Sequence, residues 1–116
     1  MDKQERQWVI AEVQAERERL LPLREEATRT TIELVRKSGG QVSEPDLVPY
    51  LNLAYLLGVK RGRGEDELMA FALSLANWAV AAVADLAKYS DQTVEQVVDM
   101  YETALMAAAE VGEEPT

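Results

Sequence analysis

Residues 68–84 read LMAFALSLANWAVAAVA, a run of seventeen residues without a charged side chain. Only Ser74 and Asn77 interrupt its apolar character, and acidic residues border it at Glu67 and Asp85. A helix that is apolar on nearly every side belongs in a protein core or in a membrane. The run is rich in alanine, short for a bilayer crossing, and flanked by acids rather than by Lys or Arg. We therefore expect a buried central helix over about residues 65–88, and no membrane.

One side of this helix carries a row of small residues, spaced three and four apart, that would let a second helix approach closely. That second helix could come from the same chain, or from a second protomer across a two-fold contact. In the latter case the amide of Asn77 would hydrogen bond across the contact, because a buried amide needs partners. The row consists of Ala70, Ser74, Asn77, Ala81 and Ala84.

Residues 47–57, LVPYLNLAYLL, are apolar apart from Asn52 and predict a second, heavily buried helix. Asp46 is a candidate N-cap, and a start at Pro49 fits nearly as well. Gly58 is expected to close the helix. Residues 58–64 then read as a connector rich in glycine, either solvated or in contact with an anion. Its basic residues are Lys60, Arg61 and Arg63.

Residues 3–38 predict a long charged helix with a near-heptad apolar stripe, interrupted by Pro22. Proline lacks a backbone donor and crowds the preceding turn, so we expect a kink or break near residues 20–21. Gly39 and Gly40 are expected to end the helix in a left-handed conformation. The helix is too long for the remaining core, so part should pack back and the rest should pair with a second copy. The candidate contacts there are Trp8, Val9, Val13 and Leu20.

A last helix is expected to start at Thr93, which forms a reciprocal capping box with Gln96. One of its faces is apolar (Val94, Val97, Val98, Tyr101, Leu105 and Ala108), and the opposite face carries Glu95, Asp99 and Glu102. The chain is thus predicted to be all-α, a small bundle of four to five helices in one domain. Its parts are the charged helix (1–38), a connector (39–46), the helical core (47–111) and a disordered tail (112–116).

The composition of the 116-residue chain argues against catalysis. Histidine and cysteine are absent, which removes the commonest general base, thiol chemistry and the commonest metal ligands. No catalytic, cofactor-binding or metal-binding residues are therefore predicted. The absence of cysteine and the charged N-terminus indicate a cytoplasmic protein. Abundant alanine, with arginine preferred over lysine, hints at a bacterial or phage genome.

Charge is divided unevenly along the chain. Residues 1–38 hold eight basic and eight acidic side chains, and residues 39–116 hold four and thirteen, so the net charge of −9 lies in the second part. An acidic surface disfavours binding to a phosphate backbone and is compatible with a basic protein partner or with plain solubility.

The sequence predicts a small regulatory protein that acts through helix–helix contacts, as a homodimer and without catalysis. The alternative is a protein linked to nucleic acid, in one of two forms. It would either bind DNA through the N-terminal helix and residues 60–63, or imitate DNA with its acidic half and inhibit a basic partner. A third hypothesis is an enzyme or ligand carrier with a pocket among Tyr50, Tyr55 and Trp78.

Overall fold

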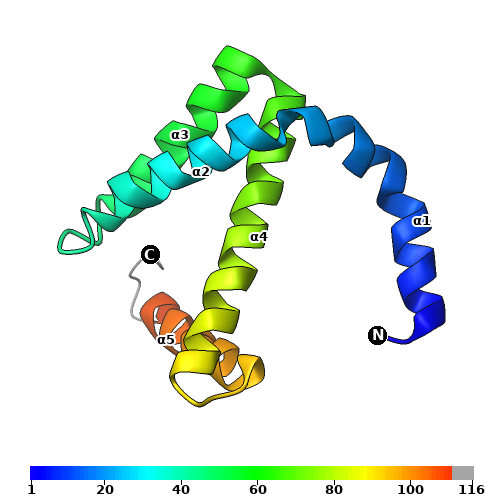
Figure 1. Ribbon diagram of the computed structural model, residues 1–116. Coiled ribbons are helices and arrows are strands. Elements are labelled where there is room, and N and C mark those ends of the chain that lie inside the picture. The colour runs from blue at the N-terminus through cyan, green and yellow to red at the C-terminus, as the bar shows by residue number, and fades with distance from the viewer. Residues whose placement is uncertain (111–116) are drawn as a thin grey trace.

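The computed structural model describes residues 1–110, with side chains described through residue 107. All regular structure in this range is helical, which confirms the predicted all-α class. The predicted disordered tail, residues 112–116, lies outside the described residues. In chain order the elements are α1 (Lys3–Leu20), the 3-10 helix η1 (Leu21–Leu23), α2 (Arg24–Gly39), α3 (Val48–Arg63), α4 (Glu65–Tyr89) and α5 (Val94–Glu110) (Figure 1).

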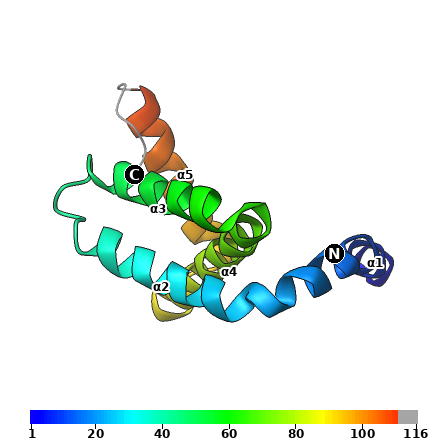
Figure 2. The same ribbon diagram turned by 90° about the horizontal axis from the view of Figure 1, so that it is seen from above.

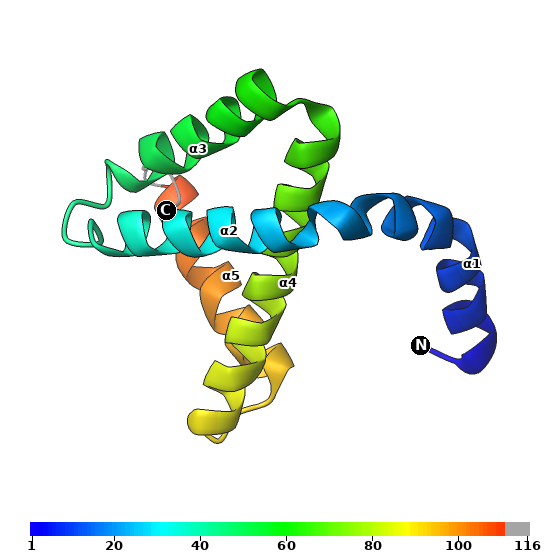
Figure 3. The same ribbon diagram turned by 45° about the horizontal axis from the view of Figure 1, so that its top comes forward.

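Helix α4 is the central element of a four-helix bundle formed by α2–α5. Helices α2 and α3 lie side by side and pack on the N-terminal half of α4, whereas α5 packs on its C-terminal half (Figures 1 and 3). The main core forms where the first three meet: Leu34 of α2, Val59 of α3 and Phe71 of α4 are buried together. A bundle of four to five helices was predicted, and four helices pack against one another.

The chain breaks at Pro22, as predicted. Helix α1 ends at Leu20, and η1 carries the chain through a bend into α2 (Figure 2). Leu20 is buried against Ala27 and Ala70, which fixes the bend on α4. Arg19 forms ion pairs with Glu16 and with Asp66 at the start of α4. Hydrogen bonds to these two carboxylates raise the pKa of Arg19 above its ordinary value.

Helix α3 corrects one prediction, because Gly58 does not end it. The helix continues through Gly58 and Gly62 to Arg63, so the predicted connector at residues 58–64 is helical except for its last residue. Burial of Val59 in the core holds the chain in helical register at this point. Basic residues in the last turn also favour the helix, since they interact with the negative end of its dipole. Gly64 ends the helix at φ +98°, a conformation that favours glycine.

Other helix ends follow the sequence in part. Asp46 does not cap α3, which begins at Val48 with Pro49 in its first turn. Gly39 is the last residue of α2, but Gly40 has φ −69° and is not left-handed. The predicted capping box is confirmed. The backbone N–H of Thr93 donates to Oε1 of Gln96 at 2.8 Å, and the backbone N–H of Gln96 donates to Oγ1 of Thr93 at 3.1 Å.

The central helix is much less buried than predicted. In the most apolar 18-residue window of α4, 11% of the residues are buried. Helices α2 and α3 cover only one side of its N-terminal half, and α1 turns away instead of packing along it (Figure 3). The chain is accordingly expanded: its radius of gyration is 16.5 Å, against about 13 Å for a compact domain of this length. An apolar helix that a single chain leaves open raises the question of what covers it.

Candidate interaction surfaces

The most prominent surface is an apolar stripe along α4. Residues with alternating spacings of four and three lie on one side of a helix and form the seam of a coiled coil. On α4 this spacing joins Met69, Leu73, Ala76, Val80, Val83 and Ala87. Ala87 is buried where α5 packs and Val83 is half-buried, but the first four residues are exposed. We call these four, residues 69, 73, 76 and 80, the open stripe of α4.

Sequence reasoning missed this stripe, although its spacing was readable. It singled out the row of small residues on another side of the same helix. The structure divides that row: Ala70 is buried and Ser74 is half-buried against α2, whereas Asn77, Ala81 and Ala84 are exposed. Oγ of Ser74 lies 2.7 Å from Oγ1 of Thr31, so the close approach at this end is made within the chain.

Helix α1 is an arm with little contact to the rest of the protein (Figure 1). Of the four residues predicted as contacts, Trp8, Val9 and Val13 are exposed, and the side chain of Trp8 is 66% exposed. Leu20 is 7% exposed and fills the bend, so it is not available to a partner. The arm therefore presents a short apolar patch on an otherwise charged helix, formed within residues 8–13 by Trp8, Val9, Ile10 and Val13.

Helix α5 presents a half-covered apolar face. Val97 is fully buried against α4, but Val94, Val98, Tyr101 and Leu105 remain exposed. The side chain of Ala108, predicted on the same face, lies outside the described residues. The acidic residues Glu95, Asp99 and Glu102 are also exposed. Over the described part of the chain, no group of three or more acids is placed to hold a metal ion.

The basic residues predicted in the connector are instead distributed along the last turn of α3. Lys60, Arg61 and Arg63 are all exposed. Nη1 of Arg63 lies 3.4 Å from a carboxylate oxygen of Glu26 and donates to Oγ1 of Thr30 at 3.1 Å. Arg63 therefore joins α3 to α2, which reduces the positive charge available to an external anion.

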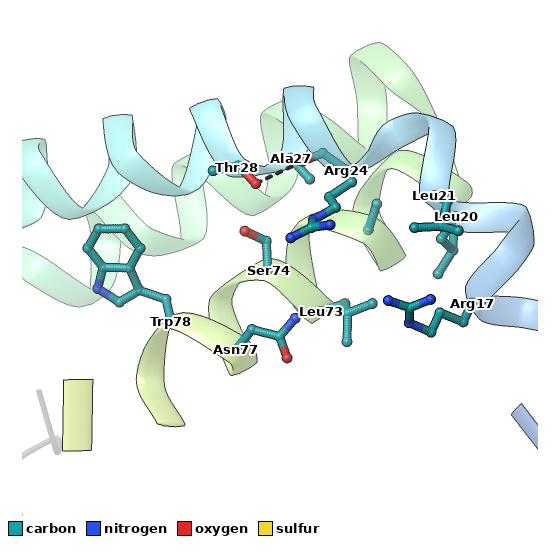
Figure 4. A pocket seen from close by; sticks show the side chains of 11 residues that line it. Arg17, Leu20, Leu21, Arg24, Ala27, Thr28, Leu73, Ser74, Asn77 and Trp78 are labelled. Carbon is teal, nitrogen blue, oxygen red and sulfur yellow. Dashed lines mark hydrogen bonds between the residues drawn. The ribbon is translucent and has the colours of Figure 1, made fainter. Parts of the chain in front are cut away.

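A pocket of about 350 Å³ lies between the bend at η1 and helix α4 (Figure 4). Leu20, Ala27 and Ala70 form its buried base. The other lining residues are Arg17, Leu21, Arg24, Thr28, Leu73, Ser74, Asn77 and Trp78. The three aromatic residues predicted to share a pocket are not brought together. Trp78 lines this pocket, Tyr55 lines a second one beside Arg63, and Tyr50 lines neither.

Helix α4 is also long and apolar enough, by length and composition, to cross a membrane; among the described helices it is the one that meets this criterion. Three acidic residues occupy its first turn. Helix length and composition alone do not distinguish a membrane span from a helix covered by protein.

Comparison of the chain with protein families, with curated proteins and with solved structures finds no match in any of the three.

Proposed function

We propose that this protein is a small helical protein–protein interaction protein that works as a homodimer, without catalytic activity. The second copy covers the open stripe of α4 and the exposed face of α5, with the patch at residues 8–13 of α1 contributing to the contact. In keeping with its composition, we propose a regulatory role in the cytoplasm.

One observation carries the proposal, and that is the surface area of the chain. The accessible surface is 9095 Å². A monomeric globular protein of this mass exposes roughly 6,300 Å². The difference is about 2,800 Å² per chain, or about 5,600 Å² for two chains. Interfaces of obligate dimers remove roughly 2,000–5,000 Å² or more from both partners together, so a dimer of this kind accounts for most of the excess.

The pattern of the exposed residues supports a helical partner. A seam with four–three spacing is complementary to another such seam, because side chains of one helix fill holes between side chains of the other. The C-terminal end of the apolar stripe of α4 is already covered by α5 of the same chain, where Ala87 and Val97 are buried. A helix of a second copy would continue this cover over Met69, Leu73, Ala76 and Val80.

The alternatives linked to nucleic acid receive less support. Direct binding to DNA is opposed by the net charge of −9, and of the basic residues at 60–63 Arg63 is held by Glu26 and Thr30. Imitation of DNA would need carboxylates in a regular array. Glu95, Asp99 and Glu102 are exposed on α5, but no further feature of the described residues singles out a basic partner.

The proposal is tested by the mass of the protein in solution, measured by light scattering after size exclusion. We expect about 26 kDa, twice the 12.9 kDa of one chain. Val80→Glu should give the mass of one chain, because it places a charge in the open stripe. Val42→Glu is the matched control, since Val80 and Val42 are 70% and 72% exposed and Val42 lies outside all proposed contacts.

Helical content from circular dichroism shows whether the Val80→Glu protein remains folded. A wild-type protein with the mass of one chain at micromolar concentration would contradict the proposal. The proposal would also be contradicted if both the Val80→Glu protein and a Trp8→Glu/Val13→Glu double variant kept the mass of a dimer. Wild-type protein that is monomeric and floats with phospholipid vesicles would instead assign α4 to a membrane.

A further inference from the structure

The pocket at the bend is positively charged in a protein that is strongly acidic. Two of its eleven lining residues, Arg17 and Arg24, are basic, and none is acidic. The chain as a whole has 21 acidic and 12 basic residues. Neither arginine forms an ion pair with another described residue, whereas Arg19, Arg29 and Arg63 all do.

The fold brings these two arginines to one place. Arg17 lies in the last turn of α1 and Arg24 is the first residue of α2, and η1 bends the chain between them. Both side chains extend towards α4, where Ser74, Asn77 and Leu73 lie (Figure 4). Two guanidinium groups that face one site repel each other unless an anion lies between them. Their planar donor pairs match the geometry of a carboxylate or a phosphate.

Apart from Thr28, Ser74 and Asn77, the remainder of the pocket lining is apolar. Its base is Leu20, Ala27 and Ala70, and Leu21, Leu73 and Trp78 also line it. Trp78 lies at the opposite end of the pocket from Arg17 (Figure 4). A volume of about 350 Å³ is at the small end of the range for small-molecule sites. An occupant that fits both parts has an anionic head and a compact apolar body.

We propose that this pocket binds a small amphiphilic organic anion, an aryl- or alkyl-substituted carboxylate, with Arg17 and Arg24 on the carboxylate and Trp78 against the apolar body. The carboxamide of Asn77 is placed to hydrogen bond to the same head group. This inference goes beyond self-association. Every residue of the pocket comes from one chain, although Leu73 belongs both to the pocket lining and to the open stripe of α4.

The test uses 4-phenylbutyrate as the probe and 4-phenylbutyramide as its uncharged analogue. The protein contains two tryptophans, so Trp8→Phe leaves Trp78 as the single tryptophan, whose emission is followed. We expect saturable binding of the carboxylate, seen as a change in Trp78 emission and confirmed by calorimetry. The amide should bind at least about tenfold more weakly, since it lacks the charge-assisted hydrogen bonds.

Substitution then separates this pocket from general binding to apolar surface. Arg17→Ala and Arg24→Ala should each weaken binding of 4-phenylbutyrate about tenfold or more. Arg36→Ala is the matched control: Arg36 is exposed on α2, does not line the pocket, and should leave binding unchanged. None of the three changes should alter the mass of the protein in solution.

Three outcomes would overturn the inference. The first is the absence of saturable binding. The second is equal affinity for the acid and the amide, which would indicate apolar contact alone. The third is a change of mass in the Arg17→Ala and Arg24→Ala proteins without any binding of 4-phenylbutyrate, which would assign the two arginines to carboxylates of a second copy. Mass and binding are measured separately. Absence of 4-phenylbutyrate binding would therefore not contradict the proposed dimer, and a monomeric protein would not contradict the proposed binding site.

Discussion

At the scale of single residues, the bundle depends on polar side chains of α2 that are buried and satisfied. Thr30, Thr31 and Ser38 are all buried. Thr30 accepts from Arg63, and Ser38 lies 2.6 Å from the amide oxygen of Asn52 on α3. Thr31 joins α2 to α4, and no buried side-chain polar atom in the described residues lacks a partner. These bonds set the lateral position of α2 on its two neighbours, because a shift would leave buried polar groups unpaired.

The bond between Thr31 and Ser74 gives the first prediction. Oγ1 of Thr31 lies 2.9 Å from the carbonyl oxygen of Ala27 and 2.7 Å from Oγ of Ser74. Thr31→Val keeps the shape of the side chain and removes both bonds, so we expect a loss of about 1–2 kcal/mol in the free energy of unfolding. Urea denaturation at a fixed protein concentration measures it.

A matched control for this change lies on the same helix. Thr28 also hydrogen bonds to the carbonyl oxygen four residues earlier, but it is exposed. Thr28→Val should change the stability by no more than about 0.5 kcal/mol. Ser74→Ala should lower the free energy of unfolding by less in the Thr31→Val protein than in the wild-type protein, since the hydroxyl of Thr31 that Ser74 contacts is already absent. Strict additivity of the two changes would show that the bond does not couple α2 to α4.

At the scale of elements, helix α3 shows where the sequence misled. Glycines at positions 58, 62 and 64 among basic residues are typical of a loop. Local propensity was overruled by a tertiary contact, the burial of Val59 between α2 and α4, which no local pattern reveals. By contrast, the break at Pro22 and the capping box at Thr93 were predictable. Each depends on covalent geometry or on residues three positions apart.

Gly58 and Gly62 within α3 and Gly64 at its end give a second prediction, in which the first two substitutions stabilise the protein and the third destabilises it. A Cβ added at Gly58 or Gly62 meets nothing within 4 Å, so Gly58→Ala and Gly62→Ala should each stabilise the protein by about 0.5–1 kcal/mol. Gly64 has φ +98°, and Gly64→Ala should destabilise it by about 1–3 kcal/mol. Thermal unfolding followed by circular dichroism measures all three. If residues 58–63 were a flexible loop, the first two substitutions would have no such effect.

The sequence identified which helices carry the candidate surfaces, but it did not identify which of their residues remain exposed. The sequence identified α4 as the most apolar helix, and its seam at residues 69, 73, 76 and 80 has a readable spacing. Which side of α4 remains open, however, depends on how far α2, α3 and α5 extend along it. The pocket was not predictable, because Arg17 and Arg24 meet only through the bend at η1 and the packing of Leu20 on Ala70.

At the scale of the whole molecule, the described part of the chain leaves more large apolar side chains exposed than it buries. Large apolar side chains on α1, α4 and α5 are open to solvent. The buried apolar residues are Leu20, Ala27, Leu34, Val59, Ala70, Phe71, Ala87 and Val97. Burial of apolar area contributes roughly 25 cal/mol per Å². A second copy that covers the open stripe of α4 therefore adds to the stability of the fold itself, and folding and association become coupled.

This coupling predicts that thermal stability depends on protein concentration. A partner that binds only the folded chain stabilises it by mass action, so raising the concentration from about 1 µM to about 100 µM should raise the midpoint of unfolding by about 5 °C. The Val42→Glu protein should show the same dependence. The Val80→Glu protein should have a lower midpoint of unfolding than the wild-type protein, and this midpoint should not change with concentration. The reason is that its open stripe no longer accepts a second copy. A wild-type midpoint that does not move with concentration would mean that the bundle is stable as a single chain, and the exposed face of α4 would then need a different partner.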